Sequence, residues 1–156
     1  MTAVDALHGH RILHGDLKPS NFLMFGGDLR LNDFDTAHFM DDPDAGSQGR
    51  LFGTPGFWSP RLDRQPPGWK YDEDDDWMGL ALTFAFWFGI YTPERQDPAA
   101  AQVSKEAMAE MVANDKVAKV ELLLNSKLTP KDFKERLLPV FERVEKEVRA
   151  LMQQAV

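Results

Sequence analysis

The sequence contains no cysteine, which excludes disulfide bonds, cysteine-ligated zinc and a cysteine nucleophile. That absence suits a reducing compartment, and the amino terminus lacks the layout of a secretory signal, so we expect an intracellular, cytoplasmic protein. An excess of basic residues is also missing, because 18 lysines and arginines face 25 aspartates and glutamates, for a formal net charge of −7. This charge argues against nucleic acid or an anionic membrane surface as a partner.

Long hydrophobic runs are equally scarce. The longest covers residues 77–90, fourteen positions interrupted by Thr83, whereas a membrane-spanning helix needs about 20. We therefore predict a buried helix there. With 156 residues, of which 43% are hydrophobic, the chain is expected to form one globular domain of ordinary size.

The remaining pattern predicts a mainly α-helical fold with a small β-hairpin. A short helix is expected within residues 1–13, and strands at 22–25 and 29–31 flank a tight Gly-Gly-Asp turn. Residues 33–67 are dense in glycine, proline and aspartate without a persistent period, which predicts a long functional loop.

The carboxy-terminal part is expected to be helical. The acidic run at 72–76 suits a helix amino end, where free N–H groups attract negative charge, and a cation site is the minor alternative. Thr129 is expected to cap the last helix, and Pro139 to kink or break it. The predicted helical stretches after residue 100 are 103–114, 116–124 and Pro130 onward.

The residues that carry chemistry lie upstream. Residues 14–21 read His-Gly-Asp-Leu-Lys-Pro-Ser-Asn, and Asp-Phe-Asp follows at 33–35, across the predicted hairpin. This order brings two loop carboxylates, one lysine and one amide to one end of a small sheet. Phosphoryl transfer from a nucleotide needs a carboxylate to orient the attacking hydroxyl, a cation for the phosphoryl group, and oxygen ligands for Mg²⁺.

The residue types assign these roles. Asp16 suits the carboxylate that accepts the hydroxyl proton, and Lys18 suits the cation. Asn21 and Asp33 suit the metal ligands, because an amide together with a carboxylate fits a metal that keeps waters and phosphate oxygens in its shell. The expected cofactors are therefore ATP and Mg²⁺.

In these blocks the sequence resembles the carboxy-terminal catalytic lobe of the protein kinase family. Residues 14–21 are similar to the catalytic loop H-R-D-x-K-x-x-N, and 33–35 to the D-F-G metal-binding motif. Residues 53–60, Gly-Thr-Pro-Gly-Phe-Trp-Ser-Pro, resemble the substrate-docking end of the activation segment, G-T-x-x-Y-x-A-P-E. Asp75 and Trp77 resemble the start of the central buried helix of the family.

The resemblance implies the same roles for these residues, because they match positions that have these roles in protein kinases. Asp16 would be the catalytic base, and Lys18 would contact the transferring phosphate. Asn21 and Asp33 would hold Mg²⁺. Thr54, at the substrate-docking end, would hydrogen-bond near Asp16 and Lys18. A lysine two residues after the aspartate is typical of serine/threonine-directed members.

The resemblance also implies a domain organisation. The chain would be one partial kinase-like domain over 1–156, with its activation segment at 33–61, its central helix at about 75–90 and its last helices at about 103–155. Only thirteen residues precede His14, so we expect the ATP-covering amino lobe to be absent from this chain and activity to be impaired. A protein substrate and the missing amino lobe are the partners that this implies, whereas the oligomeric state stays open.

Three positions depart from the family pattern. Gly15 replaces the arginine that in many relatives pairs with a phosphorylated loop, so we expect little activation by a phosphate on Ser47. Asp35 replaces the glycine of D-F-G and either adds a metal ligand or disturbs loop closure. Arg61 replaces the glutamate of A-P-E, so the usual ion pair behind the loop cannot form in its usual polarity.

Two other functions compete with a protein kinase. Phosphotransferases of the aminoglycoside and choline type also use H-G-D-x-x-x-x-N. Gly15 and Asp35 favour this class of enzyme, whereas Lys18-Pro19 and the block 53–60 argue against it. A non-catalytic, pseudokinase-like binding module is the third possibility. An exposed apolar patch on the surface that normally meets the amino lobe would favour that function.

Overall fold

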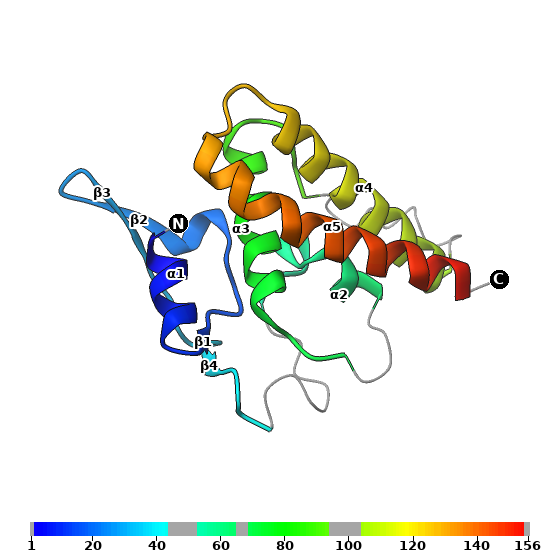
Figure 1. Ribbon diagram of the computed structural model, residues 1–156, viewed down its shortest axis with the longest axis horizontal. Helices are drawn as coiled ribbons and strands as arrows, with labels where there is room; N and C mark the ends of the chain where they lie inside the picture. The colour runs from blue at the N-terminus through cyan, green and yellow to red at the C-terminus, as the bar shows by residue number, and fades with distance from the viewer. Residues whose placement is uncertain (1, 44–52, 65–68, 94–103, 155–156) are drawn as a thin grey trace.

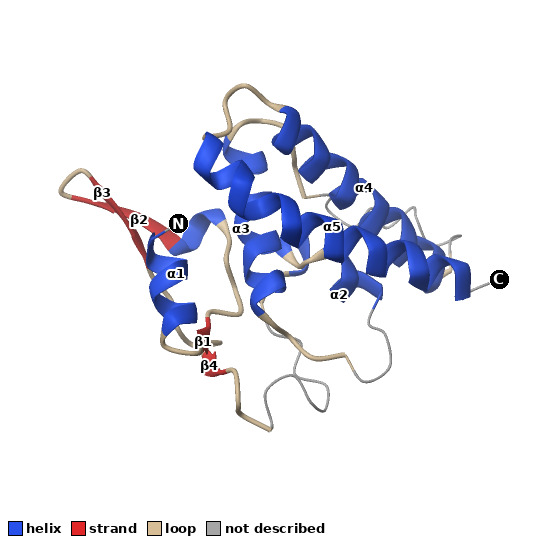
Figure 2. Cartoon of the chain, in the orientation of Figure 1, coloured by secondary structure: helices blue, strands red, loops and turns tan. Residues whose placement is uncertain are grey.

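The computed structural model is mainly helical, with two small antiparallel sheets (Figure 1 and Figure 2). It describes residues 2–43, 53–64, 69–93 and 104–154. In chain order the elements are α1 (Thr2–Gly9), β1 (Ile12–Leu13), the 3₁₀ turn η1 (Pro19–Asn21), β2 (Phe22–Phe25), β3 (Asp28–Leu31), β4 (His38–Phe39), the 3₁₀ turn η2 (Pro55–Phe57), α2 (Pro60–Arg64), α3 (Glu73–Trp87), α4 (Lys105–Asn125) and α5 (Lys131–Gln154). The predicted mainly α-helical fold with one small hairpin is confirmed.

The hairpin of β2 and β3 projects from the helical body (Figure 1). Its register pairs Phe22 with Leu31, and the chain reverses at Gly26 and Gly27, whose φ angles are 58° and 90°. Two consecutive positive φ values define the turn that matches the twist of paired strands, and glycine adopts them without steric cost. The prediction of this hairpin is confirmed, and β3 begins one residue earlier than expected.

The prediction of an uninterrupted loop over residues 33–67 is wrong in three places. Strand β4 pairs with β1, with Leu13 opposite His38, and η2 and α2 follow after residue 53. These elements have two to five residues, too few to show a period, and tertiary contacts hold them in place. Ser47 lies outside the described residues, so the expectation that a phosphate on Ser47 causes little activation stays a prediction.

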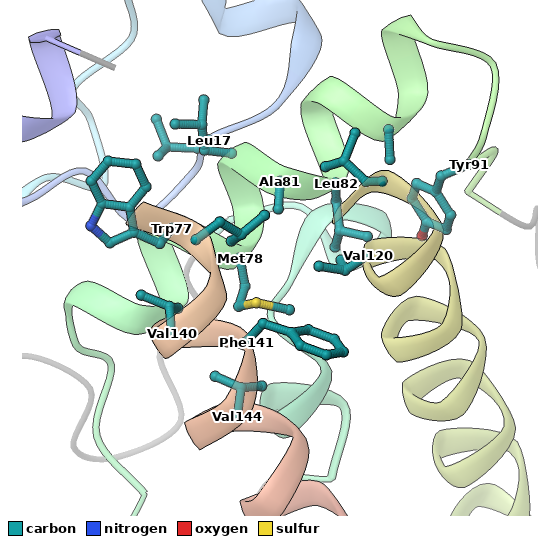
Figure 3. Packing of buried hydrophobic residues seen from close by; sticks show 14 of the residues in the cluster. Leu17, Trp77, Met78, Ala81, Leu82, Tyr91, Val120, Val140, Phe141 and Val144 are labelled. Atoms are coloured by element: carbon teal, nitrogen blue, oxygen red, sulfur yellow. The ribbon is translucent and has the colours of Figure 1, made fainter. Parts of the chain in front are cut away.

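Helix α3 lies at the centre of the core, between the loop segments and helices α4 and α5 (Figure 3). Met78, Ala81 and Leu82 are fully buried, and side chains such as Val120 and Val144 reach them from α4 and α5. The predicted buried helix is therefore confirmed. None of the helices in the described parts of the chain is long and apolar enough to span a membrane.

Helix α4 is continuous, so the predicted break between residues 114 and 116 is wrong. Its buried positions recur three or four residues apart across the expected break, which keeps one face on the core. These positions are Ala113, Lys116, Val120 and Leu123. Thr129 donates its hydroxyl to the carbonyl oxygen of Leu123 at 2.7 Å, so it closes the end of α4 rather than capping α5.

Helix α5 also runs without a break, although Pro139 lies inside it. A proline removes one backbone hydrogen bond and crowds the preceding turn. Here an apolar stripe continues on both sides of it, with Leu137 before the proline and Val140 and Val144 after it, all buried against the core. Burial of this stripe compensates for the local cost. The predicted break at Pro139 is therefore wrong, and the alternative of a kink stays a prediction.

Candidate functional site

Asp16, Lys18 and Thr54 form a closed set of polar contacts. The hydroxyl of Thr54 donates to Oδ1 of Asp16 at 2.9 Å, and Nζ of Lys18 lies 2.8 Å from Oδ2 of Asp16. Nζ of Lys18 also donates to the Thr54 hydroxyl at 2.7 Å. The structure thus brings together three predicted site residues, and Thr54 reaches the other two from a segment 36 positions away.

Asn21 supports the same carboxylate from behind. Its side chain is buried at the end of η1, and Nδ2 donates to the backbone oxygen of Asp16 at 2.8 Å and to Oδ2 of Asp16 at 3.3 Å. Pro19 at the first position of η1 has the fixed φ that suits such a turn. The amide nitrogen is therefore turned toward Asp16, and the amide oxygen is the end that can meet a cation.

Asp33 lies next to this group without joining it. The backbone N–H of Asn32 donates to the backbone oxygen of Asn21 at 2.8 Å, which holds Asp33 one residue from that contact. Asp33 itself is exposed, has a φ of 61°, and accepts the backbone N–H of Asp35 at 3.4 Å. Within the described parts of the chain no side-chain hydrogen bond joins Asp33 to Asn21.

The oxygen atoms of Asn21 and Asp33 fit a partly hydrated Mg²⁺. Both are hard ligands, and Mg²⁺ usually takes one or two protein oxygens with waters and phosphate oxygens in its remaining positions. In the parts of the chain that the structure describes, no three histidine, aspartate or glutamate side chains converge as a metal cage. The residues present therefore suit a metal that arrives with a phosphate ligand better than a resident structural ion.

Sequence reasoning missed Asp76, which holds the loop of residues 14–21 to the core. Its fully buried carboxylate accepts the backbone N–H groups of His14 at 2.9 Å and Gly15 at 3.0 Å. It also accepts the Tyr71 hydroxyl at 2.8 Å and lies 2.9 Å from Nε2 of His8. Burial alone would raise the pKa of Asp76, but these hydrogen bonds outweigh burial and lower it.

The acidic run at 72–76 caps α3 as predicted, but two of its members are buried, which was not predicted. Asp72 accepts the backbone N–H of Asp74 and Asp75 accepts that of Asp72, so the run caps α3 as expected. Asp75 and Asp76, however, are 1% and 0% exposed. The helical spacing could have indicated that Asp76 is buried, because residue 76 lies on the same face as the buried residues at 80 and 83.

His14 is an anchor of the loop. Nδ1 of its buried ring accepts the backbone N–H of Asp16 at 3.2 Å, which leaves Nε2 to donate to the backbone oxygen of Asn32, also at 3.2 Å. These partners fix a neutral ring with its proton on Nε2. Gly15 has a φ of 84°, and a Cβ atom there would lie 2.9 Å from the backbone oxygen of Thr36.

Arg61, which directly follows residues 53–60, forms an ion pair of reversed polarity. Its guanidinium binds both carboxylate oxygens of Asp75, at 2.7 and 2.6 Å, and contacts Asp72 at 2.5 Å and Glu147 at 3.1 Å. Burial alone would lower the pKa of Arg61, but the bonds to Asp75 and Asp72 raise it overall. The expectation that the usual polarity is lost agrees with these contacts.

Comparison with known proteins identifies the family of this chain. The protein kinase domain matches residues 1–156. A calcium/calmodulin-dependent protein kinase of Emericella nidulans is 30% identical over 145 residues, which cover 90% of this chain and 34% of that protein. A serine/threonine-protein kinase of Toxoplasma gondii is 37% identical over 89 residues, 56% of this chain and 15% of that protein.

A CBL-interacting protein kinase of Oryza sativa subsp. japonica is 36% identical over 96 residues, which cover 60% of this chain and 17% of that protein. The chain thus spans about a third or less of the length of these relatives. The match of the kinase domain over the whole chain agrees with the mainly helical fold and its two small sheets. The chain belongs to the protein kinase family and has the fold of its carboxy-terminal lobe.

Proposed function

We propose that the chain supplies the catalytic lobe of a serine/threonine protein kinase, which transfers a phosphoryl group from ATP to a protein hydroxyl. The observation that carries this proposal is the contact set of Asp16 with Lys18 and Thr54. In that set a carboxylate, a cation and a hydroxyl from the docking segment meet within hydrogen-bond distance. Phosphoryl transfer depends on positioned groups of these kinds.

Each side chain would have one task. Asp16 would orient the attacking hydroxyl and accept its proton. Lys18 carries three N–H donors, and the contacts with Asp16 and Thr54 use two directions, so a third donor can reach a phosphoryl oxygen. The oxygen atoms of Asn21 and Asp33 would hold Mg²⁺, which neutralises phosphate charge when it is bound with ATP.

The packing of the docking segment favours a protein substrate over a small molecule. Gly53 has a φ of 81°, and a Cβ atom there would lie 2.6 Å from the backbone oxygen of Gly15. The segment thus lies directly against the catalytic loop, and Thr54 continues that contact at Asp16. An extended peptide laid along this segment would bring its hydroxyl to the same carboxylate, and Lys18 favours serine or threonine as the acceptor.

The exposed side chains of the hairpin favour a second candidate, a binding module without catalysis. Leu23 is 46% exposed, Met24 67%, Phe25 66% and Leu29 51%, an unusual amount of apolar surface for two adjacent strands. An amino lobe, from the same polypeptide or from another chain, is the partner that the family implies for this surface. If no lobe covers it, these side chains would instead bind another protein.

Phosphate transfer from labelled ATP distinguishes these functions. The chain is incubated with Mg²⁺, ATP and either a mixture of basic proteins or a mixture of small alcohols and aminoglycosides. Because activity without the amino lobe is expected to be impaired, we expect slow labelling of serine and threonine on the proteins, and Asp16→Asn should lower this rate by a further factor of about 10² to 10⁴. Asp28→Asn, on the exposed hairpin, is the matched control and should keep the parent rate.

Two results would contradict the proposal. Label on the small acceptors and none on protein would favour the small-molecule phosphotransferase. No label on either class, together with no shift of the unfolding temperature on titration with Mg·ATP, would favour the binding module. Circular dichroism of Asp16→Asn confirms that a lost rate is not a lost fold.

A further inference from the structure

Lys116 is a buried cation that the proposed reaction leaves without a role. It lies on the inner face of α4 with 0% of its surface exposed. Its ammonium donates to Oδ2 of Asp63, on α2, at 2.7 Å and to the backbone oxygen of Pro55, at the start of η2, at 2.8 Å. One side chain of α4 thus contacts two short elements, η2 and α2, that lie 61 and 53 positions earlier in the sequence.

Stability alone is a poor explanation for this pair. Burial lowers the pKa of Lys116 and raises that of Asp63 to about 6, although each charge partly offsets the shift of the other. Both shifts show that the interior disfavours the charged forms. Replacing a buried ion pair by apolar residues of similar volume is often neutral or stabilising. The ammonium therefore contributes something that apolar packing would not, namely a donor for Pro55.

Pro55 is the first residue of the turn that carries the docking segment. It has no N–H group, so its carbonyl oxygen is the backbone atom through which another element can hold it. Thr54, the residue before it, donates to Asp16. The next carbonyl of the turn, that of Gly56, accepts the Tyr91 hydroxyl at 2.5 Å. Lys116 on α4 and Tyr91, beyond the end of α3, therefore hold this turn by two adjacent carbonyl groups.

We propose that Lys116 is a positioning residue for the proposed phosphoryl transfer: by binding the carbonyl group of Pro55, it keeps the hydroxyl of Thr54 between Asp16 and Lys18. Asp63 orients the ammonium from its other side. The inference rests on the proposed function for its catalytic consequence, whereas the anchoring of the turn can be measured without any activity.

Hydrogen exchange of the turn tests the anchoring. The backbone N–H of Phe57 donates to Thr54 and that of Trp58 to Pro55, so both amides report on the order of η2. The double variant Lys116→Met, Asp63→Leu removes the donor and both charges. We expect its unfolding temperature to lie within a few degrees of the parent, with exchange at both amides about tenfold faster, as befits the loss of one charged hydrogen bond.

The control is Lys119→Met, the same substitution on the same helix. Lys119 is partly exposed and lies 4.0 Å from Asp115, so its loss should leave exchange in η2 unchanged. Rates are referred to the amide of Val144 in the core of α5. Unchanged exchange of Phe57 and Trp58 in the folded double variant would overturn the proposal.

Asp63→Asn provides a second arm should the double variant not fold. The side-chain oxygen of the asparagine can still accept from the ammonium of Lys116, which therefore stays next to the Pro55 carbonyl, and exchange of Phe57 and Trp58 should stay within about twofold of the parent. Tenfold faster exchange in Asp63→Asn would mean that the ion pair, rather than the bond to Pro55, orders the turn. That result would also overturn the proposal.

Kinetics then separate this inference from the proposed function. In the double variant the KM for a peptide substrate should rise about tenfold while the KM for ATP stays within twofold, because the docking turn meets the peptide and not the nucleotide. Equal KM values for peptide in parent and double variant would contradict the positioning role. A parent chain that transfers no phosphate would contradict the proposed function, while the exchange data still decide the anchoring.

Discussion

The carboxylate of Asp76 accepts the backbone N–H of His14 at 2.9 Å, although 62 positions separate the two residues. The same carboxylate accepts the N–H of Gly15 at 3.0 Å. Because Asp76 belongs to the most buried helix of the fold, the peptide that precedes Asp16 is fixed directly to the core. The orientation of the candidate site therefore depends on a residue that is itself fully buried.

Asp76→Asn tests how much this anchor stabilises the fold. Asparagine has the same size but presents an NH₂ group, a donor, to some of the donors that the carboxylate accepted. Hydrogen bonds to a charged group contribute about 1.5–3 kcal/mol each, so the free energy of unfolding in urea should fall by about 3 kcal/mol. Glu73→Gln, exposed on the same helix, should change it by less than about 0.5 kcal/mol. A similar small loss in Asp76→Asn would show that the anchor is dispensable.

Gly15→Ala tests whether the family arginine could be tolerated at this position. The φ of 84° disfavours any side chain, and the added Cβ would lie 2.9 Å from the backbone oxygen of Thr36. We expect a loss of about 2 kcal/mol in the free energy of unfolding.

Gly9→Ala is the matched control for this substitution. A Cβ atom at Gly9 meets nothing within 4 Å, so the change there should be neutral or slightly stabilising in a urea titration. Equal effects at the two glycines would contradict the account of Gly15. A side chain at position 15, such as the arginine of the family, would then be tolerated without a conformational cost.

Local chemistry made part of the site predictable from the sequence. Asp16, Lys18 and Asn21 lie within six residues of one another, so one loop determines their grouping. Two adjacent glycines likewise determine the hairpin turn. The approach of Thr54 to Asp16 was expected because the docking block resembles that of a known family, since the two residues are 38 positions apart.

Long-range partners were not predictable in the same way. Asp76 and Lys116 carry charge, and charge in a helix usually indicates a solvated face. Both are buried because backbone groups and an opposite charge from distant segments satisfy them. A sequence gives no direct sign of such partners. The predicted break in α4 was wrong for the same reason. The buried face of this helix includes a lysine, which the sequence alone does not mark as buried.

Arg61→Glu restores the residue type that the family has at this position, and we expect it to be strongly destabilising here. The arginine lies among Asp72, Asp75 and Glu147, so a glutamate would add a fourth carboxylate and leave Asp75 buried without its cation. Breaking a buried pair costs about 3–5 kcal/mol, which the midpoint of urea unfolding can report.

The control for Arg61 is the same substitution in an exposed pair. Arg149 contacts Glu145 one helical turn away, and its side chain is 73% exposed. Arg149→Glu should therefore cost less than about 1 kcal/mol. Comparable stability of the two variants would mean that the reversed ion pair contributes little, and that the arginine has another reason to be there.

The pH dependence of stability should carry the signature of Asp63. Burial raises the pKa of this carboxyl to about 6 in the folded chain, against an ordinary value of 3.8, and Lys116 offsets only part of the rise. Between these two values the folded state binds more protons than the unfolded state. The contribution of Asp63 to the free energy of unfolding is therefore fully present below pH 3.8. It is lost as the pH rises through 6, which lowers the stability by up to about 3 kcal/mol.

Asp63→Asn removes this titration. In urea titrations the stability of the variant relative to the parent should improve by about 2–3 kcal/mol between pH 4 and pH 7, because only the parent loses the contribution of Asp63 over that interval. Asp115→Asn on α4, whose carboxylate is 44% exposed, should differ from the parent by less than about 0.5 kcal/mol at both pH values. A relative stability of Asp63→Asn that declines toward pH 7 would mean that Lys116 holds the carboxylate charged, and that attraction between the two charges outweighs their burial.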